Sequence, residues 1–222
     1  MITDRQETSW IKKPRSNNAL SLIVVLVFFT LSIYSRSVYS IFSLVVVIGI
    51  GFPLVWDGLS KEWQSLSFFK RNVKKSLVWG IGTGVISSLI GLSVIREITL
   101  PNNLGLQLLV GIPLWLLIIS PFQEFFFRGW MQSRLSDVFG KWLGLILANV
   151  CFTAWHYLSP IVDLASFPLT SWIGLVSTFF VGLLYGYSYQ RSQNVLAPWL
   201  GHSISGILFI VAGAMDLIQV IK

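Results

Sequence analysis

The chain has 222 residues, of which 54% are hydrophobic and only 11% are charged, and its mean hydropathy is +0.73. Because soluble domains carry about 25% charged residues, this composition excludes an ordinary soluble domain and indicates an all-α integral membrane protein. The net charge of +7 does not imply a nucleic-acid partner, since positive loop residues orient membrane helices. A single cysteine, Cys151, excludes an intramolecular disulfide and a multi-cysteine metal site.

The chain divides into a short polar tail at residues 1–18 and an apolar remainder at 19–222. We expect the tail to be flexible and cytosolic, and the remainder to form one transmembrane domain. The first apolar run could be a signal peptide, but no small-residue cleavage pattern follows it, so we expect a retained helix. Apolar runs of roughly 17–20 residues span the hydrocarbon core as helices. An eighth or re-entrant helix would also be compatible with the sequence. The apolar runs predict seven spans, at 19–34, 38–56, 76–95, 104–127, 142–158, 170–190 and 195–217.

Residues 61–75, "KEWQSLSFFKRNVKK", connect the second and third runs. Basic side chains alternate here with Trp63, Phe68 and Phe69, which is typical of an amphipathic segment at the membrane surface. A solvated loop is the alternative interpretation.

The Lys and Arg residues divide unequally between the two sides of the predicted bundle. With the N-terminus in the cytosol, only Arg36, Arg96 and Lys222 lie outside. Tryptophans stand near predicted span ends, where an aromatic belt places them; these are Trp56, Trp79, Trp142, Trp172 and Trp199. The positive-inside rule therefore predicts a cytosolic N-terminus. The remaining 13 basic residues are then cytosolic, at positions 5, 12, 13, 15, 61, 70, 71, 74, 75, 128, 134, 141 and 191.

The third run contains small residues four positions apart, namely Gly80, Gly84 and Ser88, with Ser87 and Gly91 in a second row. Such rows let helix backbones approach closely. We interpret them as a packing face without chemistry of its own.

Polar residues inside the predicted spans form three groups. In "PFQEFFFRGW", residues 121–130, Glu124 and Arg128 are four apart and share a helix face. In "NVCFTAWHY", residues 149–157, the residues Asn149, Phe152 and His156 share one stripe. The second histidine, His202, lies in "NVLAPWLGHSISG", residues 194–206. Ionisable groups in a bilayer are costly and usually functional. A purely structural ion pair is the alternative for Glu124 and Arg128.

The fourth and fifth runs form a predicted hairpin that turns near residues 136–140. Glu124 and His156 lie at similar distances from this turn, so we expect them to face each other. His202 is nearer the cytosolic end of its span. It reaches the same height only if the hairpin projects toward the cytosol.

These three blocks resemble the CAAX protease and bacteriocin-processing family, which comprises the type II CAAX prenyl endopeptidases and their bacterial relatives. The family pattern is Glu-Glu-x-x-x-Arg, Phe-x-x-x-His and His-x-x-x-Asn/Asp, and the resemblance covers about residues 105–210. It implies an intramembrane endopeptidase acting on a membrane-associated or prenylated peptide, with membrane lipid around it. The implied catalytic residues are Glu124, His156 and His202. The implied supporting residues are Gln123, Arg128, Phe152 and Ser205.

The chain departs from the family pattern at two positions. Gln123 replaces the first glutamate, which in the family activates water together with the first histidine, and Gly206 replaces the Asn or Asp that helps to stabilise the oxyanion. Ser205 could supply a weaker hydroxyl donor. The five aromatic residues of 121–130 would line an apolar cleft. Whether the family uses a metal is disputed; a divalent ion such as zinc would have Glu124, His156 and His202 as ligands.

Three other functions remain open from the sequence. An inactive pseudoprotease could bind a helix or lipidated tail as a scaffold or assembly factor. A haem protein could use His156 and His202 as axial ligands. A transporter is the third, although no internal repeat supports it.

Overall fold

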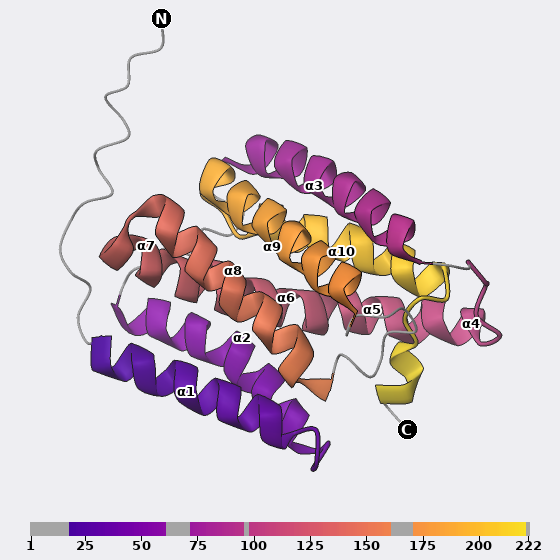
Figure 1. The fold of residues 1–222 in the computed structure, drawn as a ribbon, viewed down its shortest axis with the longest axis horizontal. Helices are drawn as coiled ribbons and strands as arrows, with labels where there is room; N and C mark the ends of the chain where they lie inside the picture. Colours follow the sequence, from indigo (N-terminus) through magenta and orange to yellow (C-terminus); the bar gives the residue numbers. More distant parts are fainter. Residues whose placement is uncertain (1–17, 61–71, 96–97, 161–170, 221–222) are drawn as a thin grey trace, which may run out of the picture.

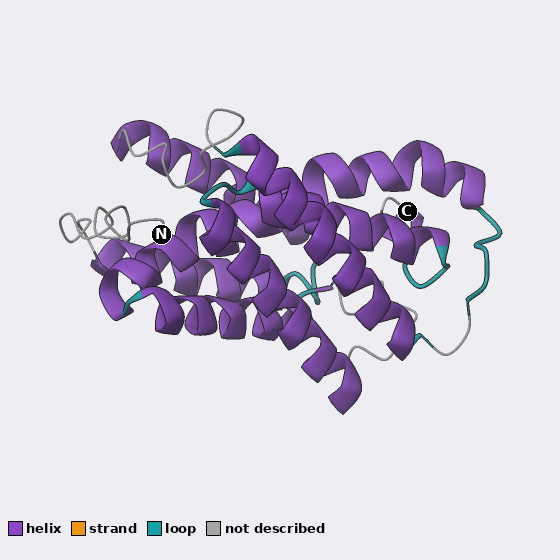
Figure 2. Cartoon of the chain, turned by 90° about the horizontal axis from the view of Figure 1, so that it is seen from above, coloured by secondary structure: helices purple, strands orange, loops and turns teal. Residues whose placement is uncertain are grey.

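The computed structural model describes residues 18–60, 72–95, 98–160 and 171–220. These parts of the chain are helical and contain no strand (Figure 2). The predicted tail and most of the 61–75 segment lie outside them, and the division into tail and single domain stays a prediction. The helices are α1 (Asn18–Tyr34), α2 (Ile41–Ser60), α3 (Val73–Val94), α8 (Lys141–Leu158), α9 (Trp172–Ser192) and α10 (Leu196–Val211), and a continuous long helix runs from Leu104 to Phe139.

The long helix mixes α-helical and π-helical turns. Its segments are α4 (Leu104–Leu106), η2 (Gln107–Gly111), α5 (Ile112–Leu114), η3 (Trp115–Ile119), α6 (Ser120–Glu124), η4 (Phe125–Gln132) and α7 (Ser133–Phe139). Proline has no N–H and clashes with the carbonyl four residues earlier. The π turns η2 and η3 end just before Pro113 and Pro121, so the prolines account for two of the three π segments.

Helix positions follow the predicted apolar runs closely, with two differences. The fourth run was expected to end at residue 127, yet the helix continues to Phe139 because Arg128 and Gln132 are buried inside the bundle. The last run was expected to reach 217, but α10 ends at Val211 and the chain turns at Gly213, whose φ is +72°. A short 3₁₀ helix, η6 (Leu217–Val220), follows this turn.

Three helices are long and apolar enough to cross a membrane, namely Val73–Val94, Leu104–Phe139 and Trp172–Ser192. Shorter apolar helices span Leu20–Tyr34, Ile41–Trp56 and Leu196–Val211. The protein is therefore a helical membrane protein, and seven passes stay a prediction. Trp142 and Trp172 lie exposed at the starts of α8 and α9, as a membrane belt requires, whereas Trp199 is partly buried and donates its indole N–H to the Leu116 carbonyl.

Helix α3 lies beside α10 (Figure 1), and its small-residue row is part of the contact. A Cβ added at Gly80 would come within 2.9 Å of the Leu200 Cβ, and one at Gly84 within 2.9 Å of the Ile204 Cβ. The predicted close approach of two helix backbones is thus confirmed, and α10 is its partner.

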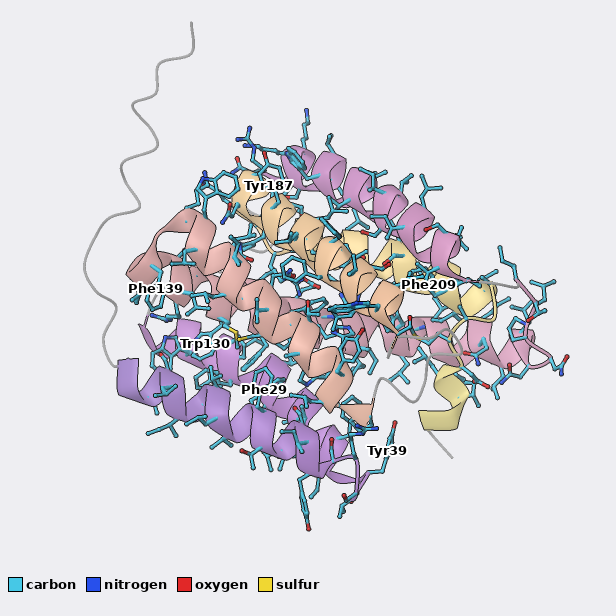
Figure 3. All side chains as sticks on the ribbon, viewed as in Figure 1. Phe29, Tyr39, Trp130, Phe139, Tyr187 and Phe209 are labelled. Atoms are coloured by element: carbon cyan, nitrogen blue, oxygen red, sulfur yellow. The ribbon has the colours of Figure 1, made fainter. Side chains whose placement is uncertain are left out.

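An aromatic core fills the space between α1, α2, α8 and the long helix. The rings of Phe28 and Phe126 stack at 3.9 Å, and Trp155 contacts Phe122 at 5.3 Å. Figure 3 shows Trp130 in the same region, between α2 and α8. The aromatics of 121–130, which were expected to line an apolar cleft, are instead buried and packed against other aromatic rings.

Candidate active site

Glu124 and His202 form the centre of the buried polar cluster. His202 Nδ1 lies 2.7 Å from Glu124 Oε1, and both side chains are almost fully enclosed. A carboxylate only accepts, so Nδ1 carries the proton and His202 Nε2 keeps a free lone pair. The acid and the second histidine, which are 78 residues apart in the chain, are thus brought together.

The hairpin of the long helix and α8 turns at Gly140, whose φ is +83°, as expected. Glu124 lies about 22 Å along the helix from Phe139, and His202 only about 9 Å from the start of α10 at Leu196. Since the two side chains touch, the hairpin must extend past the start of α10. Figure 1 agrees, with α7 lying beyond that end of α10. The hairpin thus projects past the end of the bundle where α10 begins, and the cytosolic location of that end stays a prediction.

Arg128 balances the charge of Glu124 but holds it loosely. Its Nη1 and Nε lie 3.4 Å from Glu124 Oε1 and Oε2 respectively, which is long for a charge-assisted bond. The guanidinium carbon stands 3.7 Å above the Phe152 ring, and Nη2 donates to the Gly182 carbonyl at 3.0 Å. Glu124 Oε2 has no hydrogen-bond partner among the described residues, so it can accept one more donor.

His156 is anchored within its own helix. Its Nδ1 lies 2.9 Å from the Phe152 carbonyl, which can only accept, so Nε2 is again the nitrogen with a free lone pair. The Phe152 ring contacts both imidazoles, with centroids 4.3 Å from His156 and 6.0 Å from His202. The stripe of Asn149, Phe152 and His156 is confirmed as one buried face of α8.

Gln123 is fully buried, and neither atom of its amide has a hydrogen-bond partner in the described part of the chain. An unpaired buried amide is costly, which makes it a natural place for a bound water or a substrate carbonyl. Gln123 can donate through Nε2 and accept through Oε1, but it cannot take up a proton as a glutamate does.

Side-chain hydrogen bonds fix α9 against the rest of the site. Arg128 donates to the carbonyl of Gly182 and Gln132 to that of Gly186, both at 3.0 Å, while Asn149 donates to a third α9 carbonyl, at Phe179. These contacts need glycine, since a Cβ at Gly182 would overlap Asn149 Oδ1 and one at Gly186 would come within 2.9 Å of Gln132 Oε1.

Tyr185 is a site residue that sequence reasoning missed. It is fully buried, its ring stacks on His202 with centroids 5.0 Å apart, and its hydroxyl lies 2.6 Å from Ser205 Oγ. Ser205 in turn donates to the His202 carbonyl at 3.1 Å. The only sequence signal was the spacing of Gly182 and Gly186 around Tyr185, which resembles the packing row in α3.

Trp115 is the second residue that was missed. A Cβ at Gly206 would overlap the Trp115 indole, so the space beside Gly206 is filled. The indole is buried, packs edge-on against His202 at 5.2 Å and donates Nε1–H to the His202 carbonyl at 3.2 Å. No feature of the sequence links two positions 91 residues apart.

Neither a metal ion nor a haem fits these side chains well. No group of three or more His, Cys, Asp or Glu side chains that could hold a metal ion occurs in the described ranges. Glu124 and His202 are instead hydrogen-bonded to each other, and His156 is hydrogen-bonded to the Phe152 carbonyl of its own helix. A haem between the histidines would have to displace the Phe152 ring, which packs against both.

An apolar groove of about 420 Å³ lies between α8 and α9. Thr153 and Tyr157 line it from α8, and Leu175 and Phe179 from α9. Thr153 and Tyr157 flank His156 in the sequence, so the groove runs beside the helix that carries the first histidine.

The Rce1-like type II CAAX prenyl endopeptidase family model matches residues 105–208, nearly the span of the resemblance seen in the sequence. No curated protein and no solved structure matches the chain. All three sequence blocks fall inside the matched region, and the structure brings the side chains of the first and third together. The match at residues 105–208, nearly half of the chain, therefore supports membership of the CAAX protease family, a family of membrane proteases.

Proposed function

We propose that the protein is a CAAX-protease-like intramembrane endopeptidase with altered catalytic residues, which cleaves a peptide bond in a membrane-associated or prenylated substrate. The observation that carries this proposal is the 2.7 Å hydrogen bond between Glu124 and His202, with His156 close by. A histidine oriented by a carboxylate is a common arrangement for a general base.

In this proposal His202 Nε2 takes a proton from water while Glu124 holds Nδ1–H. The water oxygen bonds to the scissile carbonyl carbon, and the C=O electron pair moves onto oxygen. When the tetrahedral intermediate collapses, the C–N bond breaks and the leaving nitrogen takes the proton from His202. His156 Nε2 and the amide of Gln123 orient the attacking water, since both have free hydrogen-bonding capacity.

Charge balance supports a neutral His202 before the reaction. Glu124 and Arg128 neutralise each other, so a protonated histidine would give the buried cluster a net positive charge, at considerable cost in a low-dielectric interior. During proton transfer, the carboxylate beside Nδ1 stabilises the imidazolium that forms.

The substrate in this proposal is a peptide with a membrane-embedded or lipidated segment. The apolar groove between α8 and α9 has the volume and lining for a hydrocarbon chain, and it adjoins the helix of His156. Membrane lipid would occupy the groove between catalytic cycles.

We also propose that the end of the bundle at which α1 begins faces the cytosol. Lys141 and Arg191 lie near each other there, because Gln190 donates to the Lys141 carbonyl. Asn72, at the start of α3, donates to the Ser192 carbonyl, which brings Lys74 and Lys75 to the same end. The clustering of basic residues at one end is what the positive-inside rule requires of a cytosolic face.

A pseudoprotease that holds a membrane partner is the second candidate. It is favoured by Gln123, which cannot act as a base, and by the indole of Trp115 in the space beside Gly206. Co-purification of a stable, uncut membrane protein with the wild-type chain would support it.

Cleavage of a prenylated CAAX peptide by the purified protein in liposomes tests the proposal. We expect Glu124→Gln to lower kcat by at least about 10²-fold, because His202 loses its anionic partner. Asp137→Asn, which removes an exposed carboxylate from the same helix, is the matched control and should retain activity. His156→Ala provides a second variant, since within the described residues its ring makes a hydrogen bond to its own helix, and it should abolish cleavage in a folded protein. Normal cleavage by both variants would contradict the proposal.

A further inference from the structure

The side chain of Trp115 fills the space beside Gly206, where a side chain at position 206 would otherwise lie. The family has Asn or Asp where this chain has Gly206, and a side chain there would overlap the indole of Trp115. Glycine at this position is thus accompanied by a buried aromatic ring that fills the vacated space.

The indole brings a hydrogen-bond donor to the same place. Trp115 Nε1 is one of the atoms that a Cβ on Gly206 would overlap, so the N–H originates where the family's Asn or Asp side chain begins. It donates to the His202 carbonyl at 3.2 Å, which is at the long end of the ordinary range for an N–H···O bond. Ser205 donates to the same carbonyl, so that oxygen keeps a partner when the indole N–H turns to another acceptor.

The neighbouring hydroxyl groups are already committed. Because Ser205 gives its proton to the His202 carbonyl, it must accept the hydrogen bond from Tyr185. Neither hydroxyl then has a proton left for a substrate. An indole only donates, which suits a partner that gains negative charge.

We propose that the Trp115 indole N–H stabilises the oxyanion of the tetrahedral intermediate, in place of the side chain missing at Gly206. This inference rests on the proposed endopeptidase function. As the hydroxide oxygen bonds to the carbonyl carbon, the negative charge develops on the former carbonyl oxygen, which accepts the Trp115 N–H until the C–N bond breaks.

Trp115→Phe tests the inference, because it removes the N–H and keeps an aromatic ring. Trp199→Phe is the matched control, since the Trp199 N–H donates to the Leu116 carbonyl at 2.9 Å across the same contact between α10 and the long helix. With the prenylated CAAX peptide in liposomes, we expect Trp115→Phe to lower kcat by about 10²- to 10³-fold with little change in KM. Trp199→Phe should stay within about threefold of wild type, because it removes a packing hydrogen bond alone.

A rescue variant separates catalysis from packing. Gly206→Asn alone should fail to fold or to cleave, because its side chain overlaps the indole. Trp115→Ala with Gly206→Asn should cleave at least about tenfold faster than Trp115→Ala alone, since an amide donor can supply oxyanion stabilisation.

The outcomes distinguish this inference from the function on which it rests. If wild type cleaves and the two Trp→Phe variants have equal kcat, the inference is overturned and the endopeptidase function stands. If wild type does not cleave the peptide, both are overturned.

Discussion

Gly182→Ala is a small change at the point where α9 approaches the catalytic cluster. The added Cβ would overlap Asn149 Oδ1 and come within 2.9 Å of the Phe152 ring. Both neighbours belong to α8, and the Gly182 carbonyl itself accepts the bond from Arg128. The helix must therefore move outward, taking Tyr185 away from His202.

The size of the effect follows from three contributions. Alanine gains about 1 kcal/mol over glycine in a helix, while forcing a methyl group into a packed contact costs about 1–3 kcal/mol. Weakening the hydrogen bond from Arg128 to the Gly182 carbonyl costs up to about 3 kcal/mol more, because the bond is charge-assisted. The contributions sum to a destabilisation between about 0 and 5 kcal/mol, with about 2 kcal/mol near the middle of that range, and a loss of about 2 kcal/mol lowers Tm by about 4–8 °C for a chain of this size.

Thermal unfolding in detergent, followed by the loss of the monodisperse peak in size-exclusion chromatography, measures this effect. Gly82→Ala is the control, because nothing lies within 4 Å of its added Cβ, and it should be neutral or stabilising. Equal Tm values for the two variants would refute the reasoning that α9 is held by close contact at Gly182.

Two further predictions concern buried polar groups. Arg128→Met should destabilise the protein by about 3–5 kcal/mol, since it leaves the Glu124 charge buried without a partner. Adding Glu124→Gln should recover part of this stability in the same unfolding assay. If the double variant recovers none, the loss is not an effect of charge. Asp216→Ala should cost about 1–3 kcal/mol, because Asp216 accepts from the buried Gln107 amide. Peptide cleavage at moderate temperature should survive Asp216→Ala, since Gln107 lies about 25 Å along the helix from Glu124; a lost activity in a folded variant would contradict this.

The local sequence pattern predicts the helices well, and it also predicts which residues share a face of one helix. Apolar run length placed most helix ends within a few residues, apart from the ends of the fourth and last runs, and Gly140 marked the hairpin turn. The α8 stripe and the row of Gly80 and Gly84 followed from helical periodicity alone. Each of these depends on residues close in sequence, which is why a single chain is sufficient to predict them.

Contacts between distant helices were not predictable in the same way. The position of Trp115 against Gly206 and the stacking of Tyr185 on His202 depend on how three helices cross. The helix end was also placed too early, because Arg128 was taken as a boundary charge, whereas burial beside Glu124 keeps it inside.

The most direct test of the central claim is cleavage of a fluorogenic prenylated CAAX peptide by the wild-type protein in liposomes, measured beside Gln123→Glu. Our account predicts that wild type cleaves, because Glu124, His156 and His202 remain in place despite Gln123. Cleavage by Gln123→Glu alone, with none by wild type, would contradict the account and identify the protein as a protease fold that has lost its base.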